Sequence, residues 1–174
     1  PDITFHIGGL SKSVSAGLRA AWVACPSIYL PQVLGAHKLM CGGKSFVLAD
    51  VSARLVNAGA AESIRDSWCA EIEARYSVLR KHLECQYISA NKSAPYIWLK
   101  LPDPWLSGTF KNAALQSNVR IDDEDEYKAG RGDSRTHGVR IAFSVPRSRS
   151  TVTRGAEAIA QLLASGPSAY HSFN

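Results

Sequence analysis

"HIGGLSKSVSAGLRAAWVACP", residues 6–26, places a single lysine, Lys12, between two short apolar runs. The runs at 3–9 and 18–25 predict two short buried strands, bounded by glycine and by Pro26, with Lys12 on their connection. Serines flank Lys12 on both sides, and Arg19 follows seven residues later. The loop therefore combines an amine, hydroxyl groups and a guanidinium within a few residues.

A lysine amine attacks a carbonyl only when it is deprotonated, so a Schiff-base lysine needs surroundings that lower its pKa from about 10.4. Burial between strands beside Arg19 would provide them. Hydroxyls, glycine amides and a guanidinium on the same loop suit a phosphate group. Aldehyde chemistry beside a phosphate site is what pyridoxal phosphate requires. A Gly-Gly-x-Ser-Lys loop between strands is more often only a turn with a solvent-exposed lysine, and the residues alone favour that simpler interpretation.

Composition indicates an ordinary globular chain. Its 174 residues are 45% hydrophobic and 20% charged, with no apolar stretch near the ~20 residues of a membrane span. The net charge of +5 is scattered, and the basic run at 145–155 lacks aromatic residues, which favours a solvated helix start over a nucleic-acid site. The four cysteines are too far apart for a Cys-x-x-Cys motif, so we expect reduced thiols, a cytoplasmic protein and no metal site.

The sequence pattern after the lysine loop predicts helices over residues 30–86. Residues 30–57 predict two helices that break at the paired glycines 42 and 43. A long helix over 60–86 follows, because its apolar residues recur every three or four positions while most of its charges lie off that face. The apolar face of this helix consists of Ile64, Trp68, Ile72, Tyr76, Leu79 and Leu83.

The second half predicts a compact α+β unit. "YIWLKL" at 96–101 alternates as a strand, and "PDPW" predicts a helix that is capped by Asp103 and runs to about 118. A short strand at 119–121, an acidic loop and a strand at 138–145 come next. A last helix is expected over 149–164, with Gly166 and Pro167 as its stop.

Several segments, in order, resemble fold-type I pyridoxal-phosphate aminotransferases. Residues 11–19 are similar to the family's Ser-Lys-x-x-x-x-Gly-x-Arg segment, and the detail is closest to the aminotransferase-like domain of MocR-type GntR transcriptional regulators. "LVNAGAAESIRDSWCAEIEARYSVLRKHL" (55–83), "YIWLKLPDPW" (96–105), "IDDEDEYKAGR" (121–131) and "GVRIAFSVPRSR" (138–149) resemble later segments of the same subgroup. The resemblance spans nearly the whole chain.

The resemblance implies roles for individual residues. Lys12 matches the lysine that binds the cofactor covalently and moves the proton in the enzymes, and Arg19 matches the phosphate-binding arginine. Arg140 matches the arginine that binds the carboxylate of an amino-acid substrate or effector. Many relatives carry a serine three residues before the lysine, where this chain has Gly9, so Ser11 becomes a candidate phosphate neighbour.

The resemblance also implies that much of the parent fold precedes Lys12. The cofactor-stacking aromatic, the aspartate that pairs with the pyridine nitrogen and most of the large-domain sheet all come earlier in this family. We therefore expect a C-terminal fragment in two parts: residues 1–50, the end of the cofactor-binding large domain, and residues 51–174, the small α+β domain. By itself such a chain is expected to be inactive.

Two functions are compatible with this expectation, beside a folded fragment that binds nothing. The first is the effector-sensing, pyridoxal-phosphate-binding part of a GntR/MocR-type regulator, whose DNA contacts belong to a missing N-terminal domain. The alternative is a fragment of a free-standing class I/II aminotransferase that acts on an amino acid. Either parent protein is expected to be a homodimer that binds an amino acid or amine and does not interact with a membrane.

Overall fold

The computed structural model describes residues 2–42, 46–91, 93–128 and 137–171. The chain packs as two compact units, residues 1–68 and 69–174, each of which is described by itself. The long helix α3 (Ala60–His82) begins in the first unit and continues into the second. The expected domain boundary at residues 50 and 51 stays a prediction.

The first unit is a β-hairpin accompanied by helices. Strands β1 (His6–Gly9) and β2 (Ala21–Ala24) pair antiparallel, with His6 opposite Ala24 and Gly9 opposite Ala21. A 3-10 turn, Ser27–Tyr29, leads into α1 (Leu30–Cys41), and α2 (Phe46–Asn57) follows. Gly42 takes a left-handed φ of 59° at the end of α1, a conformation that glycine adopts without strain. The predicted pair of helices and the break between them are confirmed.

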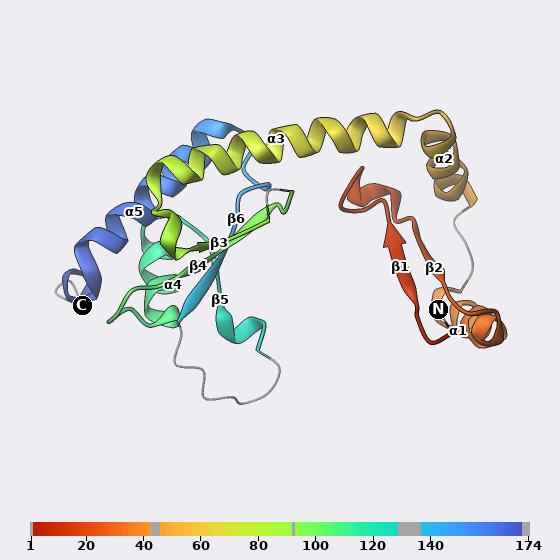
Figure 1. Cartoon of the computed structure of the whole chain (residues 1–174), viewed down its shortest axis with the longest axis horizontal. Coiled ribbons are helices and arrows are strands. Elements are labelled where there is room, and N and C mark those ends of the chain that lie inside the picture. Colours follow the sequence, from red (N-terminus) through yellow and green to blue (C-terminus); the bar gives the residue numbers. More distant parts are fainter. Residues whose placement is uncertain (1, 43–45, 92, 129–136, 172–174) are drawn as a thin grey trace. The chain divides into compact units, whose positions relative to one another are not determined.

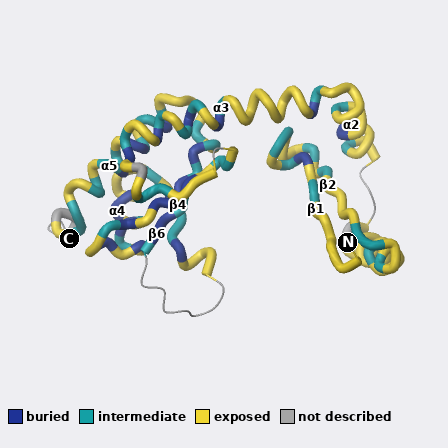
Figure 2. Tube along the Cα trace, viewed as in Figure 1, coloured by how far each residue is buried: buried dark blue, intermediate teal, exposed yellow. Residues whose placement is uncertain are grey.

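The predicted burial of the two strands is wrong. Ile7 is 75% exposed and Trp22 is 48% exposed, and Figure 2 shows β1 and β2 largely in the colours of intermediate and exposed residues. A two-stranded ribbon can bury side chains only when another layer covers a face. Within the described part of the first unit, Leu10, Ser52 and Ala61 are the buried residues.

The second unit is built on a four-stranded antiparallel sheet in the order β3-β4-β6-β5 (Figure 1). Its strands are β3 (Ile88–Ser89), β4 (Tyr96–Lys100), β5 (Asp122–Asp123) and β6 (Gly138–Ala142). Trp98 of β4 and Asp122 of β5 both stand opposite Arg140 of β6. Residues 119–121, expected as a strand, are not in one; β5 begins directly after them at Asp122, within the expected acidic loop, and is followed by the 3-10 turn Glu124–Glu126.

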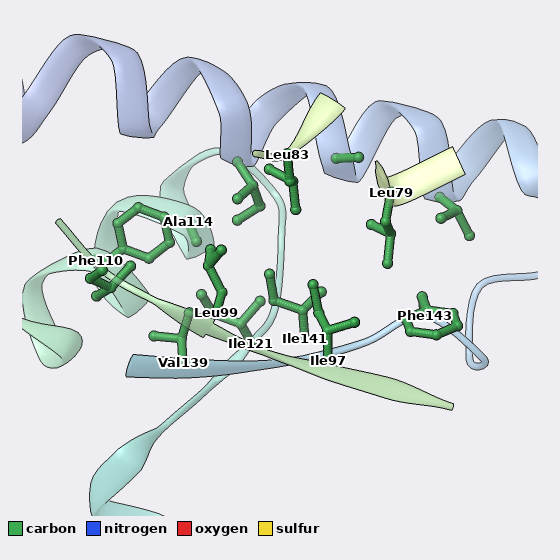
Figure 3. Packing of buried hydrophobic residues seen from close by; sticks show 14 of the residues in the cluster. Leu79, Leu83, Ile97, Leu99, Phe110, Ala114, Ile121, Val139, Ile141 and Phe143 are labelled. Carbon is green, nitrogen blue, oxygen red and sulfur yellow. The ribbon is translucent and has the colours of Figure 1, made fainter. Parts of the chain in front are cut away.

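One face of this sheet forms the core of the second unit. Alternation along β4 points Ile97 and Leu99 to the same side, as the sequence predicts, and Val139 and Ile141 of β6 lie on that side as well. Side chains of α3, α4 (Ser107–Gln116) and α5 (Arg149–His171) complete the cluster, and Figure 3 shows Leu79 and Leu83 of α3 reaching toward these strands. Trp98 and Arg140 point to the opposite face of the sheet.

The two predicted helix boundaries in this unit have different outcomes. Asp103 does not cap α4, which begins at Ser107, because a turn closed by the Trp105 amide on the Pro102 carbonyl comes first. Helix α5 contains a non-helical residue at Gly166 (φ 70°, ψ 170°), which matches the predicted stop. Among the described residues, no helix has the length and apolar character needed to span a membrane.

Candidate functional site

The loop that carries Lys12 is closed by backbone hydrogen bonds around one buried residue. The Leu10 amide donates to the Ala20 carbonyl at 3.0 Å, and the Leu10 carbonyl accepts from the amides of Val14 and Ser15 at 2.9 and 3.0 Å. Leu10 is itself buried, so the loop is anchored at its base while the Lys12 side chain stays exposed. The connection between the strands is therefore an ordered turn that presents an amine.

Lys12 lines a cavity of about 490 Å³ within the first unit. One wall is the loop itself, residues 11–16, and the other is the first part of α3. Five serines contribute to the lining, namely Ser11, Ser13, Ser15, Ser63 and Ser67. None of the described residues that line the cavity is acidic. The cavity therefore offers an amine and hydroxyls without a competing carboxylate.

The α3 wall is the part of the site that sequence reasoning missed. Trp68 was expected on a packing face, yet it is partly exposed and lines the Lys12 cavity together with Ile64. Ser67 Oγ donates to the Ser63 carbonyl at 2.9 Å, one helical turn earlier. The signal was present as two serines four residues apart on the same side of the helix as Trp68.

Arg19 lies at the far end of the same loop, outside the residues that line the cavity. It adopts a left-handed backbone conformation (φ 49°, ψ 27°), which is uncommon for any residue other than glycine. Within the described part of the chain its exposed guanidinium makes no hydrogen bond or ion pair. The structure thus brings Ser11 and Lys12 together at the cavity and leaves Arg19 available but apart.

The donor set of the first unit fits pyridoxal phosphate. The primary amine of Lys12 is accessible to an aldehyde, but it is exposed and lacks the burial beside Arg19 that the sequence predicted. Serine hydroxyls with a free guanidinium on one loop suit the phosphate. The cavity falls within the range of about 300–1,000 Å³ that is usual for small-molecule sites. A carboxylate for the pyridine nitrogen is not among the described lining residues, so these residues would supply only part of a site for this cofactor.

Arg140 belongs to the second unit and is already engaged. Its Nη1 donates to Asp122 Oδ2 at 2.9 Å and to the Tyr127 hydroxyl at 3.1 Å. The guanidinium carbon lies 4.4 Å from the centroid of the Tyr96 ring and 5.6 Å from that of Tyr127. Trp98 packs edge-on against Tyr127 at 6.0 Å between ring centroids. These contacts orient the guanidinium on the sheet face opposite the core.

Interactions within this cluster favour the charged forms of both Arg140 and Asp122. Burial lowers the pKa of Arg140, but the bonds to Asp122 and Tyr127 outweigh it, and the net pKa is above its ordinary value. The hydroxyl of Tyr127 and the guanidinium of Arg140 hold the pKa of Asp122 below its usual range. The bond to Asp122 in turn raises the pKa of Tyr127. Asp122 therefore already supplies Arg140 with a carboxylate partner inside the protein.

The acidic segment around Glu124 makes hydrogen bonds within the protein, unlike a loop exposed to solvent. Glu124 is buried and accepts from Gly138 N at 2.7 Å, with Ser107, Lys128 and His137 also within hydrogen-bond distance. Burial raises the pKa of Glu124, and these partners together bring it below the ordinary value. The segment thereby holds the start of β6, two residues before Arg140.

No family model matches the chain. It is 23% identical over 163 residues to an uncharacterized HTH-type transcriptional regulator, YdeF, from Bacillus subtilis, a match that covers 94% of this chain and 35% of the regulator. The chain therefore spans about a third of the curated relative that it matches.

Solved structures with a similar fold are aminotransferases. An α-aminoadipate aminotransferase from Thermus thermophilus has a TM-score of 0.78 at 19% identity, over 95% of this chain and 43% of that one. A kynurenine aminotransferase from Pyrococcus horikoshii has a TM-score of 0.79 at 19% identity, over 92% and 40%. The chain thus has the fold of fold-type I pyridoxal-phosphate aminotransferases, which confirms the fold prediction.

Proposed function

We propose that this chain is the cofactor-binding, ligand-sensing part of a transcriptional regulator of the MocR type. The observation that carries the proposal is the exposed amine of Lys12 in a serine-lined cavity, on a fold shared with aminotransferases. The regulator interpretation is supported by YdeF, whose match covers nearly the whole of this chain. DNA contacts would belong to another domain of the parent, which would act as a homodimer in the cytoplasm.

Each site residue has a distinct part in this proposal. Lys12 Nζ would bond to the aldehyde carbon of the cofactor, while Ser11 and Arg19 would hold phosphate oxygens. Arg140 would bind the carboxylate of an amino acid, in competition with Asp122. Pyridoxal phosphate, when bound, supplies an electron sink for bonds at the amino carbon. The described cavity lining has no acidic partner for the pyridine nitrogen, so we infer that this chain alone performs no transamination.

A free-standing aminotransferase is the alternative, and the solved neighbours favour it. One of them, the Thermus enzyme, was solved with N-(5'-phosphopyridoxyl)-L-leucine. The gene sequence upstream of residue 1 distinguishes the regulator from the enzyme. A winged-helix domain there supports the regulator, and a direct start into a large aminotransferase domain supports the enzyme.

Chemical labelling tests the role of Lys12. The chain is incubated with pyridoxal phosphate, reduced with borohydride and digested, and the modified lysines are mapped by mass spectrometry. We expect preferential modification of Lys12, and its loss in Lys12→Ala without a change at Lys81, an exposed lysine on α3. Equal modification of Lys12 and Lys81 would contradict the proposal. Arg19→Gln should lower the yield at Lys12, because the phosphate loses its guanidinium.

A further inference from the structure

A second cavity, of about 400 Å³, lies wholly within the second unit. Its floor is apolar and is formed by core residues of α3, β6 and α5. The floor residues are Leu79, Leu83, Ile141, Phe143, Val152 and Ile159. A cavity of this size and character is typical of a site that takes the apolar body of a small molecule.

The rim of this cavity carries positive charge without a counter-ion. Arg120 and Arg154 both contribute to the lining, and none of the lining residues that the structure describes is acidic. Within the described residues, the exposed Arg120 makes no hydrogen bond or ion pair, and Arg154, also exposed, donates to Thr151 Oγ1 at a long 3.5 Å. Three other arginines of this unit, Arg75, Arg140 and Arg149, are each paired with a carboxylate. The guanidinium donors at the rim are therefore open to an anionic group.

Gly155 keeps one wall of the cavity open. It lies within α5, where glycine is a poor helix former, and a Cβ built there would meet no atom within 4 Å. A Cβ at 155 therefore meets no steric obstacle. The glycine thus leaves room that any longer side chain would fill.

This cavity is separate from the Arg140 cluster. Ile141, which lines the cavity, follows Arg140 directly on β6, and successive residues of a strand point to opposite faces of the sheet. Lys12 belongs to the other unit and lines a different cavity. A ligand here would use none of the residues assigned to the cofactor or to the amino compound.

We infer that this cavity binds an organic carboxylate with an apolar body, such as a medium-chain fatty acid. Its chain lies on the apolar floor, and its carboxylate accepts hydrogen bonds from Arg120 and Arg154. Charge complementarity selects the anion, because the rim holds two guanidinium groups and no carboxylate. The inference stands independently of the proposed function.

The first test compares octanoate with its neutral analogue octanamide on the whole chain by isothermal titration calorimetry. We expect saturable octanoate binding, and octanamide binding that is about tenfold weaker, because a charged hydrogen-bond partner is lost. Arg154→Gln, at an exposed position, should weaken octanoate binding by a similar factor, as should Arg120→Gln. Exposed Arg54→Gln is the matched control and should bind as the native chain does.

The second test fills the cavity. Gly155→Leu should abolish octanoate binding, whereas Gly108→Leu, at another helical glycine with open space around its Cβ, should preserve it. Methyl NMR shifts should map to Leu83, Ile141 and Ile159. Octanoate binding that survives Gly155→Leu, or methyl shifts confined to residues 3–56, would overturn the inference. An octanamide affinity equal to that of octanoate would overturn it as well.

Discussion

Arg140 and Asp122 stand opposite each other on neighbouring strands, and a 2.9 Å hydrogen bond joins Arg140 Nη1 to Asp122 Oδ2. The pair occupies the guanidinium that the proposed function assigns to a ligand carboxylate. Because one nitrogen of Arg140 is committed to Asp122 and Tyr127, a ligand must use the other nitrogens or displace the aspartate. Asp122 is therefore a built-in competitor whose removal has a measurable consequence.

Asp122→Asn should strengthen the binding of simple carboxylates to Arg140. The variant keeps the shape of the side chain but removes the charge that competes for the guanidinium. The free energy of unfolding should fall by less than about 1 kcal/mol, because the pair is partly exposed. Acetate titrations followed on the Arg140 side-chain Nε–H NMR signal provide the measurement. Asp123→Asn, which changes a neighbouring carboxylate paired with Lys111, is the control. Identical acetate affinities in both variants would contradict the prediction.

Arg75→Met should destabilise the second unit strongly. Arg75 is only 6% exposed, and its Nη1 donates to the carbonyls of Phe143, Ser144 and Pro146. Removing the guanidinium leaves these carbonyls unsatisfied in the protein, which costs about 3 kcal/mol in free energy of unfolding. Urea denaturation measures the loss.

The control for this variant is Arg149→Gln. Arg149 also pairs with Glu71, at 2.6 Å, but it is solvent-exposed. Its substitution should have a much smaller effect than Arg75→Met. Equal losses of stability would mean that the bonds to the three carbonyls contribute little.

Patterns of apolar residues predicted the second unit well. The alternation of Ile97 and Leu99 and the helical spacing of Leu79 and Leu83 each identified a face that the structure buries. Such patterns succeed because a sheet or helix that buries one face imposes its own period on the sequence. Arg75 was missed for a related reason: a charged residue is expected in solvent unless its partners are known, and these partners lie nearly 70 positions away.

Two predictions from short sequence signals were wrong, because the same residues are also compatible with a different local structure. Asp103 and Pro104 match a helix start, yet the segment forms a turn and α4 begins at Ser107. The acidic residues from 122 to 126 match a loop. In the structure, Asp122 and Asp123 pair with β6 to form β5, and Glu124–Glu126 form a 3-10 turn. Of the candidate site, sequence identified the Lys12 loop, but the wall from α3 depends on tertiary packing that no local pattern records.

Gly138→Ala should lower stability although alanine is the smallest possible addition. A Cβ at 138 would lie 2.5 Å from Trp98 Nε1, so the indole must move from its packed position on β6. Overpacking of this kind costs about 1–3 kcal/mol in free energy of unfolding. Gly108→Ala, with open space around its Cβ, is the control and should be neutral or slightly stabilising. Thermal unfolding distinguishes the two, and a Gly138→Ala midpoint at or above the native value would contradict the assigned contact.

Acid should weaken the second unit through Glu71. The guanidinium groups of Arg149 and Arg75 lower the pKa of Glu71 from 4.5 to about 2. Because the folded pKa lies below the unfolded value, the unfolded state binds the proton first as the pH falls. The stabilisation is fully present above about pH 4.5 and is lost as the pH falls toward 2. Glu71→Gln should therefore be less stable than the native chain at pH 6, and the difference in free energy of unfolding should shrink steadily between pH 5 and pH 2. A difference that stays constant over this range would show that Glu71 does not stabilise the fold as a charged partner of the two arginines.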